Sequence, residues 1–84
     1  MKRRRDENEK SVVRALEAAG ALVFRIECRE RSGCPDILVM YRGQAFAMEV
    51  KTATGRVLES QKIYGVHIVR DGYEAIEIIT GVKK

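Results

Sequence analysis

Charged side chains interrupt two segments that otherwise have the pattern of apolar β-strands, and they constrain the fold more than any other feature of this chain. Asp36 begins the run Asp-Ile-Leu-Val-Met, and Glu49 and Lys51 fall within the run Ala-Met-Glu-Val-Lys. Because side chains alternate between the two faces of a strand, Glu49 and Lys51 share one face while Met48 and Val50 share the other. The second segment therefore has one apolar face and one charged face.

A tight Arg-Gly turn after Tyr41 would place two carboxylates opposite each other. If Tyr41 pairs with Gln44, counting back one residue per strand sets Asp36 opposite Glu49. Cross-strand partners on one face have Cβ atoms about 4.5–5.5 Å apart, where two carboxylates repel unless they share a cation. Oxygen ligands suit a hard divalent ion, so the hairpin predicts a site for Mg²⁺ or Mn²⁺.

Length and charge limit the remaining possibilities. The 84 residues form one small domain, residues 1–84, near the size at which a single core is marginally stable, so a second subunit that adds buried area is compatible with this length. A net charge of +4 allows a polyanionic partner. The apolar runs are too short for a transmembrane helix, and acidic residues follow the basic N-terminal arm, residues 1–5, where a signal peptide would be apolar. We expect a protein of the cytoplasm or nucleoid, or of the host-cell cytoplasm if it is viral.

Hydrophobic periodicity and turn signals predict the element order α-β-β-β-α-β in an α/β fold. Asp6 followed by Glu9 resembles a capping box, and Gly20 marks a helix end. Glu9 lies on the stripe of the helix that faces the sheet, whereas Glu7 lies off it. The buried stripe consists of Val12, Val13, Leu16 and Ala19. The predicted elements are a helix over residues 7–19, strands over 21–28, 36–41 and 45–51, a helix over 58–70 that closes at Gly72, and a last strand over 73–79.

Three motifs in this order resemble those of a known nuclease family. Gly33-Cys34-Pro35-Asp36 is similar to a G-x-P-D motif, Glu49-Val50-Lys51 to an E-x-K motif, and Gln61 follows ten residues later. The family is the VRR-NUC (virus-type replication and repair nuclease) domains of the PD-(D/E)XK superfamily. Leu58 departs from the helix-capping Ser or Thr frequent there, and the family's helix Glu corresponds to Glu7 or Glu9. The resemblance implies a restriction-endonuclease-like core, with a mixed sheet flanked by helices.

Phosphodiester hydrolysis needs a metal-activated water and stabilisation of negative charge at phosphorus. Asp36 and Glu49 would hold Mg²⁺ or Mn²⁺ with the Val50 carbonyl, and Glu9 would bind the metal or its water. Lys51 would orient the water or stabilise the developing charge, and a general-base role stays open. The remaining catalytic candidate, Gln61, would hydrogen-bond the lysine or the water.

We expect two groups of basic residues to contact a DNA backbone, and a solvated terminus stays open as the other reading of the first group. Four of them form an N-terminal arm and four others lie near the predicted site: Lys2, Arg3, Arg4 and Arg5, then Arg25, Arg29, Arg31 and Arg56. Such contacts bind phosphates and carry little sequence information. The resemblance implies an endonuclease for structured or branched DNA, similar to Holliday-junction resolvases, that works as a symmetric homodimer. We expect neither an organic cofactor nor an association with a membrane.

Other readings of the same residues stay open. Asp36 can cap the turn after Pro35, and Glu49 with Lys51 can form the solvated face of an edge strand. A non-catalytic DNA-binding module would keep the fold without needing these three residues together. A sequence-specific restriction-type nuclease or an RNase would use the same chemistry on another substrate.

Overall fold

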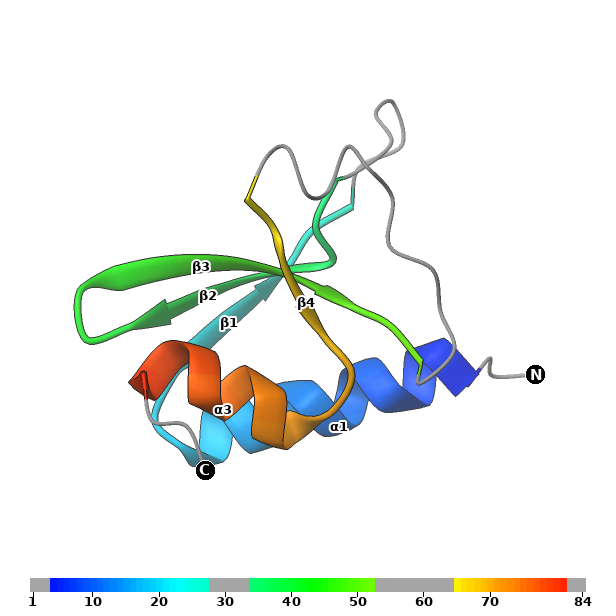
Figure 1. Ribbon diagram of the computed structural model, residues 1–84, viewed down its shortest axis with the longest axis horizontal. Helices are drawn as coiled ribbons and strands as arrows, with labels where there is room; N and C mark the ends of the chain where they lie inside the picture. The colour runs from blue at the N-terminus through cyan, green and yellow to red at the C-terminus, as the bar shows by residue number, and fades with distance from the viewer. Residues whose placement is uncertain (1–3, 28–33, 53–64, 82–84) are drawn as a thin grey trace.

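A four-stranded mixed sheet with helices packed against it forms the described part of the chain (Figure 1). The computed structural model describes residues 4–27, 34–52 and 65–81. The sheet order is β1-β2-β3-β4, antiparallel between the first three strands and parallel between the last two. The elements are α1 (Arg4–Ala18), β1 (Leu22–Arg25), β2 (Ile37–Tyr41), β3 (Gln44–Val50), β4 (His67–Val69) and α3 (Gly72–Thr80). The predicted α/β class with a mixed sheet flanked by helices is confirmed.

Helix α1 ends where the sequence predicted but begins earlier. Gly20 has a φ of +96°, its N–H donates to the Glu17 carbonyl, and the Ala21 N–H donates back to the Leu16 carbonyl. This pair of bonds is a Schellman motif, which needs a left-handed residue that glycine adopts readily. At the other end the helix starts at Arg4, so the prediction of Asp6 as its N-cap is wrong. Arginine favours helix formation, which extends α1 into the predicted basic arm.

The β2–β3 hairpin has the predicted turn. Arg42 and Gly43 have φ values of +49° and +79°, as in a type I′ turn, whose twist matches that of the strands it joins. Tyr41 pairs with Gln44, and the same register continues to Ile37 opposite Met48. The register counted from the turn is therefore confirmed along the whole of β2.

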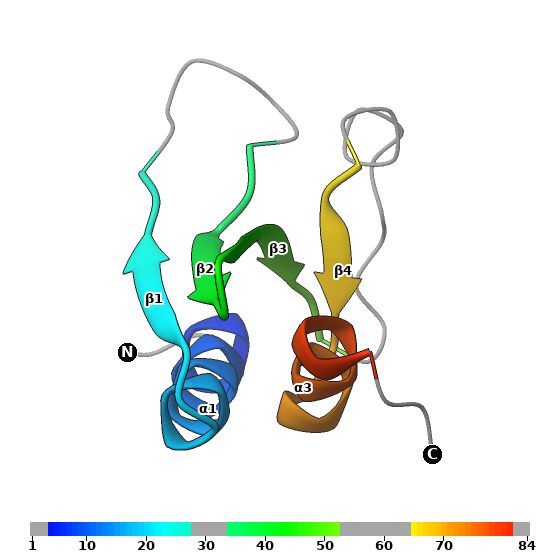
Figure 2. The ribbon, with the colours of Figure 1, turned by 90° about the vertical axis from the view of Figure 1, so that its left-hand side faces the viewer.

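The core lies between the helices and one face of the sheet. Figure 2 shows α1 and α3 side by side beneath the strands. The fully buried side chains of α1 are Val12 and Leu16, on the predicted stripe, with Val13 and Ala19 beside them. The sheet and α3 contribute Ile37, Val39, Met48, Val50, Val69, Ala75 and Ile79. None of the helices in the described ranges is long and apolar enough to span a membrane.

The predictions for the C-terminal third are corrected. Residues 67–69 form β4 instead of the end of a helix, and the predicted last strand, residues 73–79, lies within helix α3. Asp71 caps this helix, since its side chain accepts a hydrogen bond from the Glu74 N–H at 2.9 Å. Ala75 and Ile79 are buried one turn apart, so the apolar residues follow a helical period that outweighs the strand preference of isoleucine. The rest of the predicted second helix, up to residue 64, lies outside the described residues.

Candidate active site

Asp36 is held at the start of β2 by bonds to both of its neighbours in the sheet. Its N–H donates to the Met48 carbonyl at 3.0 Å, and its carbonyl accepts from the Ile26 N–H at 2.9 Å. The regular β2–β3 ladder ends at Ile37, so Asp36 does not form the regular pair with Glu49 that simple counting predicted. Instead its carboxylate oxygen Oδ2 accepts the Val50 N–H at 2.9 Å. The carboxylate therefore lies against the peptide group that joins Glu49 to Val50.

Glu49 is a buried carboxylate on the sheet face that points away from the core. Its neighbours Met48 and Val50 are fully buried in the core, and Glu49 itself is only 3% exposed. Lys51 is two residues further on and shares its face; the Lys51 Nζ lies 3.5 Å from Glu49 Oε2. A buried charge is costly unless it is paired or binds a metal, so the ammonium offsets part of that cost.

Two carboxylates and one ammonium thus gather at the open end of the hairpin, with a formal charge of −1. This set of oxygen donors fits a hard divalent cation in chemistry and in sign. Asp36 directly precedes β2, Glu49 lies on the adjacent strand β3, and the Asp36 carboxylate accepts the N–H of the peptide group that joins Glu49 to Val50. Within the described ranges, no three His, Cys, Asp or Glu side chains gather closely enough to hold a metal ion. The described part of the site therefore consists of the Asp36 carboxylate on the Val50 N–H and the Glu49 carboxylate beside the Lys51 ammonium.

Glu9, the helix glutamate predicted to bind the metal or its water, faces the sheet but lies apart from Asp36 and Glu49. The Glu9 side chain is 22% exposed, and its Oε2 lies 3.8 Å from the Arg25 Nε. Glu7 is exposed, so of the two candidates Glu9 is the one turned toward the sheet. Glu9 does not join Asp36 and Glu49 in a three-carboxylate group in the described structure. Arg25, predicted to contact DNA, has Glu9 as an ion-pair partner.

Several predicted site residues have no described surroundings. Arg4 and Arg5 belong to the first turn of α1. The other basic residues and the catalytic glutamine lie outside the described residues: Lys2, Arg3, Arg29, Arg31, Arg56 and Gln61.

The structure adds two residues that the sequence analysis missed. Asn8 donates from Nδ2 to the carbonyl oxygens of Lys51 and Arg70, both at 2.9 Å. Arg70 in turn donates from Nη1 to the Thr52 carbonyl. The signal for Asn8 was its position, because it lies one helical turn before Val12 on the buried stripe of α1. An amide on such a stripe needs hydrogen-bond partners inside the fold.

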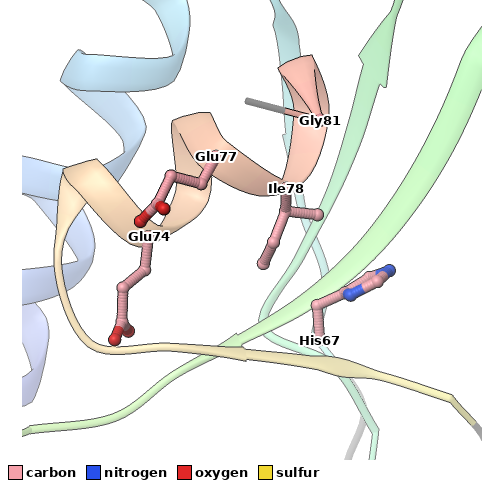
Figure 3. Close-up of a pocket in the computed structure, with 5 residues that line it drawn as sticks. All are labelled: His67, Glu74, Glu77, Ile78 and Gly81. Carbon is pink, nitrogen blue, oxygen red and sulfur yellow. The ribbon is translucent and has the colours of Figure 1, made fainter. Parts of the chain in front are cut away.

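A pocket between β4 and α3 lies apart from these residues. It has a volume of about 400 Å³ and is lined by His67, Glu74, Glu77, Ile78 and Gly81. In Figure 3 the His67 ring and the Glu74 carboxylate point away from each other. Glu74 Oε1 accepts the Arg70 N–H at 2.6 Å. This bond at the start of α3 gives Glu74 a structural role. The pocket contains none of the predicted catalytic residues.

Comparison with known proteins identifies the fold. A solved structure described as "VRR_NUC domain" superposes with a TM-score of 0.67 at 24% sequence identity, covering 94% of this chain and 97% of that chain. No protein-family model matches the sequence, and no curated protein matches it. The resemblance predicted from the motifs is therefore confirmed for the fold, over nearly the whole chain.

Proposed function

We propose that this chain, which has the VRR_NUC fold, is a metal-dependent nuclease that hydrolyses phosphodiester bonds in DNA. The observation that carries the proposal is the burial of Glu49 on the outer sheet face, 3% exposed, with the Lys51 ammonium 3.5 Å away. A glutamate that served only as a surface residue of an edge strand would be exposed to water. A buried carboxylate beside a second carboxylate and a lysine matches the needs of phosphoryl chemistry instead.

The residues divide the work by their positions. A divalent ion, when bound, polarises a phosphate oxygen and lowers the pKa of its water. Asp36 and Glu49 would hold this ion, Mg²⁺ or Mn²⁺, with the Val50 carbonyl as a further proposed ligand, and Glu9 would bind a water of the ion. The Val50 N–H fixes one Asp36 oxygen, which leaves that carboxylate little freedom to turn away.

Lys51 supplies the positive charge of the site. Its ammonium lies beside Glu49 and would face the phosphorus as negative charge develops there, which favours the transition state over the bound substrate. Loss of a proton from Lys51 would allow it to act as general base in place of this role. We assign Gln61 the role of hydrogen-bonding the lysine or the attacking water.

We propose branched or otherwise structured DNA as the substrate, as in Holliday-junction resolvases. The formal charge of +4 favours a polyanion, and contacts to phosphates by Arg and Lys carry no base readout. Selection would then come from the shape of the DNA and from the spacing of two active sites in a symmetric dimer.

An apolar surface on the outer sheet face supports pairing of two copies. Cross-strand neighbours on β1, β2 and β3 form this open face: Leu22, Phe24, Leu38, Met40, Ala45 and Ala47. Leu22 is 58% exposed, Phe24 48% and Met40 37%. The six positions hold no charge, so two positively charged copies would meet there without like charges in contact. Ala47 precedes Glu49 by two residues, about 6.5 Å along β3, so the two sites would flank the interface.

A substrate panel tests the proposal. The purified protein is incubated with a four-way junction, a flap, a linear duplex and RNA, each with Mg²⁺ or Mn²⁺, beside Asp36→Ala and Lys51→Ala. We expect junction cleavage that needs metal and is lost in both variants. Binding without cleavage under either metal would favour a DNA-binding module. Cleavage that depends on a short duplex sequence, or that occurs only on RNA, would replace the junction substrate.

A further inference from the structure

The backbone that carries Lys51 lies where two parallel strands come to an end. Val50 and Val69 are the last residues paired between β3 and β4, and the Lys51 N–H still donates to the Val69 carbonyl at 2.9 Å. The carbonyls of Lys51 and Arg70 follow this last bond. Partly buried carbonyls at such a point need donors from elsewhere in the fold.

Asn8 supplies both donors from one nitrogen. Its Nδ2 lies 2.9 Å from the Lys51 oxygen and 2.9 Å from the Arg70 oxygen. An amide NH₂ has two hydrogens, so one group serves two acceptors, and only this orientation of the amide can donate to both. In Figure 1 the end of β3 comes down beside the N-terminal half of α1. Asn8 therefore fastens the helix to the ends of both strands.

Arg70 braces the next peptide group. Its guanidinium donates to the Thr52 carbonyl, and its own N–H is held by Glu74 at 2.6 Å. Lys51 is thus fixed at its amide by Val69 and at its carbonyl by Asn8. Since a side chain leaves the backbone in a direction set by φ, ψ and a few rotamers, these bonds determine where the Lys51 ammonium can reach.

We infer that Asn8 is a positioning residue for Lys51, a role that rests on the nuclease function proposed above. Asn8 bonds to the backbone of Lys51 and leaves the ammonium facing Glu49. Asn8 would therefore contribute to catalysis by setting the direction of the Lys51 side chain, whose charge acts mainly in the transition state. Loss of Asn8 lowers kcat and leaves KM for DNA nearly unchanged.

The experiment compares Asn8→Ala and the nearly isosteric Asn8→Asp with wild type in the full chain. Asn8→Asp keeps the packing but sets a carboxylate against two carbonyl oxygens. We expect kcat on a cleaved junction to fall by about tenfold to a hundredfold in both variants, the usual cost of losing a group that orients a site residue. KM should stay within about twofold of wild type.

Amide hydrogen exchange gives a readout that does not depend on activity. In both Asn8 variants the Lys51 amide should exchange faster relative to the Gly81 amide, which bonds to the Glu77 carbonyl at 2.8 Å in α3. The matched control is Thr80→Ala, which removes a side-chain hydrogen bond to the Ile76 carbonyl far from the site. Thr80→Ala should change neither kcat nor the exchange ratio.

Two results would overturn the inference: a kcat that stays at the wild-type value in both variants, or an unchanged ratio of Lys51 to Gly81 exchange. A wild-type protein that cleaves no DNA would instead count against the proposed function. The exchange comparison would then decide by itself whether Asn8 holds Lys51 in place.

Discussion

Glu49 and Lys51 show at the residue scale why charges in a strand are informative. An exposed ion pair contributes little to stability, but Glu49 is 4% and Lys51 14% exposed at the side chain. In such surroundings the loss of one partner removes compensation from the other buried charge, and that cost exceeds the net benefit of the pair. The two residues are thus coupled in stability as well as in the proposed chemistry.

Replacing the lysine alone should therefore destabilise the protein more than replacing both residues. We expect Lys51→Met to lower the free energy of unfolding by about 1–3 kcal/mol, because the buried carboxylate loses its counter-charge. Adding Glu49→Gln should recover most of this loss. Urea denaturation measures both, with Arg14→Met on the exposed side of α1 as the control, expected within about 0.5 kcal/mol of wild type. Equal effects of Lys51→Met and Arg14→Met would show that the Glu49–Lys51 pair does not contribute to stability.

Metal binding is testable without any DNA. A divalent ion that binds only the folded protein, at ten times its Kd, adds roughly 1.4 kcal/mol of stability. For a domain of this size that corresponds to a rise in Tm of roughly 5–10 °C. Thermal unfolding with and without Mg²⁺ or Mn²⁺ should show this rise in wild type and in Glu17→Gln, an exposed glutamate of α1, but not in Asp36→Asn. The same rise in Asp36→Asn would place the ion elsewhere.

At the element scale, the hairpin turn contains a residue that its conformation disfavours. Arg42 has a φ of +49°, where asparagine and glycine are preferred and a larger side chain costs about 1–2 kcal/mol. The guanidinium lies 5.4 Å from the centre of the Tyr41 ring, a cation–π contact of about 0.5–1 kcal/mol at an exposed site. The cost of the left-handed conformation is larger than the benefit of the cation–π contact, so the contact offsets only part of the strain.

Arg42→Asn should accordingly stabilise the protein by about 0.5 kcal/mol, by creating the Asn-Gly sequence that type I′ turns favour. Chemical denaturation measures the change. In a Tyr41→Leu background, the cation–π contact is absent both with Arg42 in place and with Arg42→Asn. The gain in stability from Arg42→Asn should then be larger. A loss of stability in both backgrounds would mean that the turn does not strain Arg42.

The elements also differ in how far the sequence could predict them. Strand alternation and the Arg-Gly turn determine the β2–β3 register, and the stripe from Val12 to Leu16 determines α1. For residues 73–79, isoleucines favoured a strand while Asp71 and Glu74 formed a helix start signal three residues apart. Local patterns do not reveal which preference wins, because the outcome depends on the burial of Ala75 and Ile79 in the core.

The site shows the same division. The positions of Asp36, Glu49 and Lys51 near one another were predictable, because the alternation of side chains along a strand and the turn at Arg42-Gly43 can be read from the sequence. The end of the regular ladder at Ile37, which turns the Asp36 carboxylate toward the Val50 N–H, was not, because it depends on how three strands end together. The Asn8 bonds join residues 43 and 62 positions apart, and no local pattern specifies such partners.

For the whole molecule, the open face is the surface on which we propose that two copies pair. Phe24→Glu places a charge on the β1 edge of this face, and a dimer formed there should dissociate because each copy would bury that carboxylate. Light scattering with size-exclusion chromatography measures the assembly. The matched control is Tyr73→Glu, since Tyr73 is 69% exposed and lies on α3, away from that face. A Phe24→Glu protein that remains dimeric would move the interface to another surface.

The most direct test of the central claim, that Asp36, Glu49 and Lys51 form a metal-dependent catalytic site, is the single-turnover cleavage rate of Glu49→Gln on a four-way junction with Mg²⁺ or Mn²⁺. The substitution keeps the size of the buried side chain and removes its charge. We predict a rate about a hundredfold to a thousandfold below wild type, with Glu17→Gln at the wild-type rate. A Glu49→Gln protein that folds and cleaves as fast as wild type would show that the buried carboxylate has no part in catalysis.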